Sequence, residues 1–154
     1  MTTTAEAFTD AQAATFAILV PMIIPASEDL GLPGANDDRI MTDILATAAR
    51  QRDAVAAALA ALDAISRETG DMDFAHLSPA ARDDAVAAFR RKHQDAAGIL
   101  ATITTQCYYR DDRVMRSLDM APRPPFPLGF EVEEGDWSLL EPVRGLDPIY
   151  RETS

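Results

Sequence analysis

The sequence predicts a mainly α-helical protein, with a small domain of three to four helices, one of them long, and an extended proline-rich C-terminal tail. Three observations predict this fold. Apolar residues recur at helical spacing through the first 120 residues. Alanine, the strongest helix former, supplies the largest share of the 47% apolar residues. Prolines gather after Met120. We therefore divide the chain into a helical domain at 1–120 and a C-terminal segment of the same domain at 121–154, which we expect to wrap a surface.

The first helix is predicted at residues 11–24, because Thr9 and Asp10 are good N-terminal caps. Pro21 is expected to kink or end it, since proline lacks the N–H that a helix interior needs. Glycines and prolines in residues 25–34 then predict a loop.

A long second helix is predicted at residues 38–68, with Asn36 or Asp37 as its cap and Gly70 as its end. Its expected core residues keep a helical spacing: Ile40, Ile44, Ala48, Val55, Leu59, Leu62 and Ile65. Ser78 and Pro79 predict the start of a third helix. The stripe expected along it is Val86, Phe89, His93, Leu100, Ile103 and Cys107. A shorter helical turn is expected at residues 112–118.

The tail after Met120 combines six prolines with many large apolar side chains. The prolines exclude long helices, but a disordered tail rarely carries so many large apolar groups. We predict an extended segment that lies across a surface, either the chain's own helices or a partner protein.

The charge of the chain limits the classes of molecule that it can bind. Its formal net charge is −11, so we expect no nucleic-acid binding and no attraction to anionic lipid. The only strongly apolar run, residues 16–24, is too short to cross a bilayer. The first residues contain neither a basic stretch nor twin arginines. With one cysteine and no disulfide possible, these features favour a cytoplasmic protein, unless another subunit carries it out of the cell.

Residue patterns for catalysis are scarce. The two histidines lie in no metal-ligand pattern, and neither a Glu-x-x-His pair nor a nucleotide-binding glycine loop is present. His93 is expected to be a hydrogen-bonded core residue, and Cys107 a small buried apolar group. Fourteen residues of helix would separate them by about 21 Å, too far for a catalytic dyad. We assign no catalytic, cofactor-binding or metal-binding residue. Tyr108, Tyr109 and Arg110 are either core and surface residues or an anchor for a partner.

Several landmarks together resemble the gluconate 2-dehydrogenase subunit 3 family. Residues 23–27 (IIPAS) and 32–35 (LPGA) are similar to its LIPAD…PGA signature. Residues 74–79 (FAHLSP) match its helix restart, and Tyr108-Tyr109 before Val114 match its paired tyrosines. The aromatic tail around Phe130 and Trp137 is similar to the C-terminal tail of the family, so the landmarks occur in the family's order. The resemblance covers residues 8–150.

The resemblance implies a non-catalytic small subunit of a flavin-dependent sugar or alcohol dehydrogenase. FAD would be held by a large partner subunit similar to glucose-methanol-choline (GMC) oxidoreductases, and this chain would stabilise that partner or assist its maturation. Family members often start with a twin-arginine signal, which this sequence lacks. The interface anchors that we predict are Tyr108, Tyr109, Arg110, Phe126, Phe130, Trp137 and Tyr150. The alternatives are a self-contained helical homo-oligomer with a structural or binding role, or an enzyme that uses His93 or a tyrosine.

Overall fold

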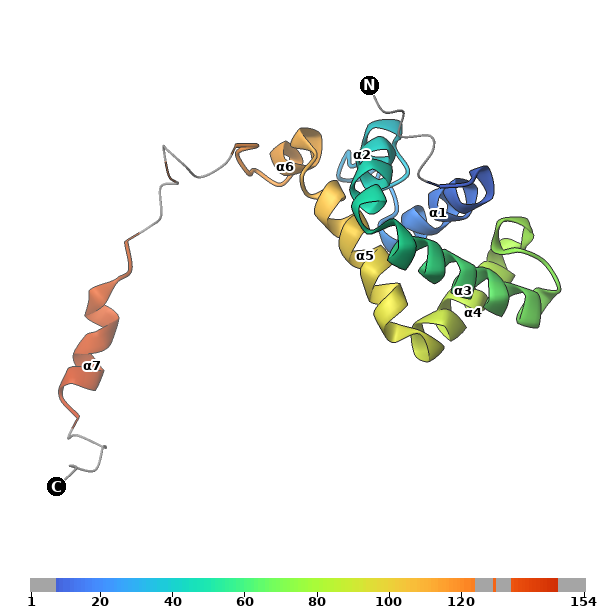
Figure 1. Cartoon of the computed structure of the whole chain (residues 1–154). Helices are drawn as coiled ribbons and strands as arrows, with labels where there is room; N and C mark the ends of the chain where they lie inside the picture. Colours follow the sequence, from blue (N-terminus) through green and yellow to red (C-terminus); the bar gives the residue numbers. More distant parts are fainter. Residues whose placement is uncertain (1–7, 124–128, 130–133, 147–154) are drawn as a thin grey trace. The chain divides into compact units, whose positions relative to one another are not determined.

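The computed structural model describes residues 8–123, 129 and 134–146, and these residues contain helices and no strand (Figure 1). The chain divides into two compact units, Met1–Pro122 and Arg123–Ser154. We call the described part of the first unit the helical body (residues 8–122) and residues 134–146 the C-terminal segment. The predicted fold class is confirmed.

Helix α1 spans Asp10–Ile23 and begins as the sequence predicts. The Thr9 side chain accepts a hydrogen bond from the Gln12 backbone N–H, and the Gln12 side chain accepts one from the Thr9 N–H. This reciprocal capping box satisfies two backbone donors that the helix leaves unpaired. Pro21 lies inside the helix and does not end it.

The long helical stretch runs from α2 (Asp38–Ala48) through a 3₁₀ turn, η2 (Ala49–Gln51), into α3 (Arg52–Gly70). The backbone of Gln51 leaves helical geometry at φ −127° and ψ 36°, and the helix axis changes direction between α2 and α3 (Figure 1). The seven apolar residues predicted to face the core are all buried. Gly70 was predicted to stop the helix, but the left-handed residue that ends it is Asp71, at φ 54°.

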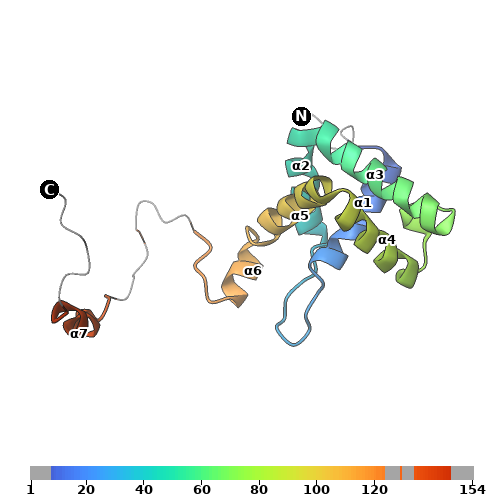
Figure 2. The same ribbon diagram turned by 90° about the horizontal axis from the view of Figure 1, so that it is seen from below.

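The predicted third helix is two helices, α4 (Pro79–Lys92) and α5 (Gln94–Tyr108), which follow a short turn, η3 (Phe74–His76). The chain bends at His93, whose φ is −132° and ψ is 57°. A straight helix over these 30 residues would be about 45 Å long and would extend beyond α3, which is about 28 Å long. Figure 2 shows the change of direction between α4 and α5. With this bend, both Phe89 and Leu100 are buried in the same core.

The prediction that His93 lies in the core is wrong, because the chain bends at this residue. The His93 side chain is exposed, not buried in the core, and its ring stacks on Phe89 with 5.9 Å between the ring centroids. Helix α6 (Asp112–Ser117) ends the helical body where the sequence predicts a short helical turn. The C-terminal segment contains two short helical turns, η4 (Trp137–Leu140) and α7 (Glu141–Arg144), which the sequence pattern did not predict.

Candidate functional site

The loop between α1 and α2 is a structured hairpin. The backbone groups of Ser27 and Leu32 exchange two hydrogen bonds, at 3.0 and 2.9 Å. Between them Gly31 takes a φ of +61°, which favours glycine. The tip is open to solvent, with the Leu30 side chain exposed, and Figure 2 shows the loop projecting from the helices.

Residues 33–35 fix the returning arm of this loop. The Ala35 N–H donates to the Ile24 carbonyl at 3.0 Å, and Ala35 is fully buried. A Cβ on residue 34 would lie 3.0 Å from the backbone nitrogen of Ala26, so Gly34 permits the close approach of the two arms. The Pro-Gly-Ala motif therefore shapes the loop through its backbone.

Tyr108 connects this loop to α5. Its hydroxyl donates to the Pro33 carbonyl at 2.9 Å, and its side chain is only 2% exposed. Burial raises the pKa of the Tyr108 phenol, since the charged form is poorly solvated there. This hydrogen bond joins the Pro-Gly-Ala motif to the paired tyrosines, 75 residues apart in the sequence.

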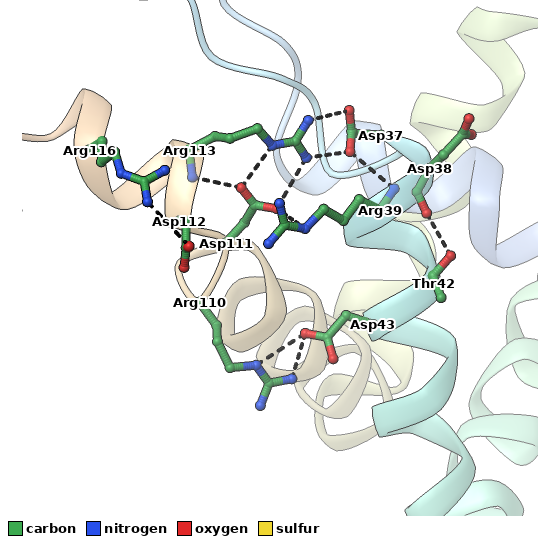
Figure 3. A network of polar contacts seen from close by, with 10 residues as sticks. All are labelled: Asp37, Asp38, Arg39, Thr42, Asp43, Arg110, Asp111, Asp112, Arg113 and Arg116. Atoms are coloured by element: carbon green, nitrogen blue, oxygen red, sulfur yellow. Dashed lines mark hydrogen bonds and ion pairs between the residues drawn. The ribbon is translucent and has the colours of Figure 1, made fainter. Parts of the chain in front are cut away.

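Two helix N-termini are joined by a network of carboxylates and guanidinium groups (Figure 3). Asp37 caps α2 and Asp111 caps α6, each through a hydrogen bond to a backbone N–H. Arg113 bridges them, with 3.1 Å from Nη1 to Asp37 Oδ2 and 3.0 Å from Nε to Asp111 Oδ1. Arg39 approaches Asp111 at 3.5 Å. The Arg113 guanidinium holds the pKa of both carboxyl groups below their usual values.

Arg110 forms a second link between α2 and the end of α5. Its guanidinium donates to Asp43 Oδ2 at 2.6 and 3.1 Å, and also to the Thr47 hydroxyl. The same group approaches the Cys107 sulfur at 3.4 Å. Cys107 is buried as predicted, and burial raises the pKa of its thiol. A thiol with a raised pKa holds little of the reactive thiolate near neutral pH.

Tyr109 faces solvent next to Tyr108. Half of its surface is exposed, and its ring meets that of Tyr108 edge-to-face with 5.3 Å between the centroids. The paired tyrosines thus differ: Tyr108 lies in the core of this chain, and Tyr109 is available to another molecule.

The C-terminal segment exposes almost all of its large apolar side chains. The Asp136 carboxylate accepts hydrogen bonds from the N–H and hydroxyl of Ser138 and caps the helical turn. Trp137, one of the predicted anchors, is 70% exposed. The further exposed apolar residues of the segment are Leu139, Leu140, Val143 and Leu146. The predicted anchors Phe126, Phe130 and Tyr150 lie outside the described residues.

The described residues contain no cluster of three or more His, Cys, Asp or Glu side chains that could hold a metal ion. His76 and His93 are both exposed and lie on separate elements. Over the same described ranges, the longest apolar stretches of helix fall short of what a bilayer crossing requires. The charged side chains of the Asp37–Arg113–Asp111 network and of the Arg110–Asp43 pair cap helices or connect one helix to another.

Sequence reasoning missed one surface, a groove of about 790 Å³ between α1, α4 and α5. Its floor is apolar, and Arg90 and Arg91 line one side. The sequence signal was a glycine in mid-helix, Gly98, whose position on the groove depends on the bend at His93.

These features define a helical domain in which the Pro-Gly-Ala loop and Tyr108 stabilise the fold of the chain itself, followed by a segment with exposed apolar side chains. The model of the gluconate 2-dehydrogenase subunit 3 family matches residues 10–121. The chain belongs to this family, whose description is that of one subunit of a multi-subunit dehydrogenase. No curated protein and no solved structure matches the chain.

Proposed function

We propose that this chain is a non-catalytic accessory subunit that binds and stabilises the FAD-containing, GMC-type large subunit of a sugar or alcohol dehydrogenase. Membership of the subunit 3 family supports an accessory role. In this proposal FAD and the reacting substrate belong to the large subunit, and this chain covers apolar surface that the large subunit leaves exposed.

The observation that carries the proposal is the exposure of five large apolar side chains within residues 137–146. Such a density of exposed apolar groups marks a protein interaction site. Trp137 is the strongest anchor among them, because tryptophan buries a large area and is enriched at energetic centres of interfaces. Tyr109 in the helical body offers a second aromatic contact. Obligate interfaces commonly bury about 2,000 Å² or more, so several such contacts are required.

Co-expression tests the proposal. The large subunit is produced alone, with the wild-type chain, and with a chain carrying Trp137→Ala and Leu139→Ala. We expect the wild-type chain to raise the yield, the FAD content per polypeptide and the dehydrogenase activity of the large subunit, and the double variant to lose most of this effect. Met72→Ala, which removes an exposed apolar group of the helical body, is the control. Equal yield, flavin content and activity with and without the chain would contradict the proposal.

The alternative function, a self-contained homo-oligomer, gives a different result in size-exclusion chromatography of the chain alone. A stable oligomer that melts cooperatively favours this alternative. A chain that aggregates alone and becomes well behaved with the large subunit favours the accessory role.

A further inference from the structure

The groove between α1, α4 and α5 has the composition of a helix-binding site. Met22 and Ile23 of α1 and Val86 of α4 line it with partly exposed apolar side chains. Phe89 and Leu100 also border it, but both are buried in the core. Its polar lining consists of Arg90, Arg91 and Gln94 at the junction of α4 and α5. A small-molecule site usually combines an apolar pocket with several convergent polar groups. An open apolar channel with charges at one margin instead matches the way grooves take up amphipathic helices.

Gly98 leaves part of the groove wall without a side chain, although the chain itself has room for one there. It lies inside α5, where glycine is less favourable than alanine because it loses more backbone freedom. No turn requires it, and a Cβ built on it meets no atom within 4 Å. Packing within the described part of the chain therefore does not explain this glycine. Ala97 and Ala101, on the same wall, are also small. Small residues let another helix approach closely.

The charge at the margin indicates the chemistry of the occupant. Arg90 and Arg91 are exposed, and neither guanidinium forms an ion pair with another described residue. The neighbouring Lys92 differs, since it pairs with Glu68 at 2.9 Å. A chain of net charge −11 thus carries, beside this groove, two adjacent cations that form no ion pair with another described residue. Carboxylates on a partner would be attracted to this margin.

We propose that this groove binds an amphipathic helix of the partner subunit, with its apolar face on Met22, Ile23 and Val86 and its acidic residues beside Arg90 and Arg91. The inference rests on the proposed function, because it takes the large subunit as the source of the helix. It adds a docking site on the helical body to the contacts of the C-terminal segment.

The test measures binding of the purified large subunit to full-length variants of this chain. Gly98→Leu fills the wall of the groove with a good helix former. The double variant Arg90→Glu, Arg91→Glu reverses the charge at the margin. We expect each to weaken the complex at least tenfold. The melting temperature of the chain alone is expected to stay the same or rise for Gly98→Leu. The affinity of the wild type is expected to fall with increasing salt more steeply than that of the charge-reversed variant.

Two matched controls separate docking from general effects. Thr102→Leu adds similar apolar bulk to α5 at an exposed position outside the groove, and Arg50→Glu reverses an exposed arginine of η2. Both are expected to bind as the wild type does. If Gly98→Leu destabilises the chain, the charge-reversed variant decides the question.

The outcomes distinguish the two proposals. A wild-type chain that binds no large subunit overturns the proposed function and this inference with it. Wild-type binding that is unchanged in both groove variants overturns the groove alone. A homodimer, detected by light scattering, that the groove variants dissociate would show that a second copy of this chain is the occupant and would also overturn the inference.

Discussion

The helical body and the C-terminal segment use the same kinds of residue in opposite ways. In the body, large apolar side chains such as Phe16, Leu62 and Phe74 are fully buried, and the polar groups cap or connect helices. In residues 134–146, Trp137 and Leu139 are more than two-thirds exposed. The body gains stability from contacts among its own helices, whereas we propose that the segment uses its apolar side chains to bind another molecule. Substitutions of buried residues in the body should therefore act on folding, and substitutions of exposed apolar residues in the segment on binding.

The largest expected difference is between two identical substitutions, Leu62→Ala in the body and Leu139→Ala in the segment. Leu62 is fully buried on α3, so its truncation should leave a cavity and lower the free energy of unfolding by about 2–5 kcal/mol. Leu139 is exposed, and its truncation should change stability by less than about 0.5 kcal/mol. Urea denaturation of the chain alone measures both values. Similar losses would show that the segment packs as a core element.

Trp137→Ala tests the comparison from the binding side. The truncation should leave the melting temperature of the isolated chain unchanged, because the ring is exposed. It should weaken binding of the large subunit about 30-fold, near 2 kcal/mol, if Trp137 is an energetic centre of the interface. Titration calorimetry with the purified large subunit measures the change, and Met72→Ala should have little effect. Unchanged affinity would remove Trp137 from the interface.

The two tyrosines provide a smaller comparison within the helical body. Tyr108→Phe deletes the hydroxyl that donates to the Pro33 carbonyl, and should lower the free energy of unfolding by about 1 kcal/mol. Tyr109→Phe should cost almost nothing, since its ring is half exposed. For binding, Tyr109→Ala should weaken the complex and Tyr108→Phe should not. Thermal melts and the same titration separate the roles, and a reversed pattern would contradict the assignment.

The smallest expected effect is a change in the pH dependence of stability. The Arg113 guanidinium lowers the pKa of Asp37 and Asp111 in the folded state. Their contribution to stability is therefore present above the unfolded carboxyl pKa, about 3.9, and is lost as the pH falls through the lower folded values. Arg113→Gln should be less stable than the wild type at neutral pH, and the difference should shrink below about pH 4.

Urea midpoints across a pH series measure this change. Arg116→Gln is the control, because it removes an exposed ion pair with 3.4 Å between its atoms on the same helix. Its midpoint at neutral pH should change less than that of Arg113→Gln. A difference between Arg113→Gln and the wild type that persists at low pH would show that lost packing, and not charge, is responsible.

Local signals in the sequence determined the starts of α1, α2, α4 and α6. Thr9, Asp37, Ser78 and Asp111 all cap helices in the structure, because each satisfies N–H groups only two or three residues away. The spacing of the apolar residues of α2 and α3 likewise predicted their burial, since a helix places residues three and four apart on one face. The family could also be predicted, because its landmarks keep their order along the chain.

Contacts between distant residues were decided only by the tertiary structure. The bend at His93 depends on packing against α3, so the sequence pattern continued the helix through it. Tyr108 is buried and Tyr109 is exposed because the Tyr108 hydroxyl bonds to the carbonyl of Pro33, a residue 75 positions away in the sequence. The groove beside Gly98 exists only because that bend sets α4 and α5 against α1. Periodicity and capping act within a few residues, whereas a groove requires three helices to be positioned in space.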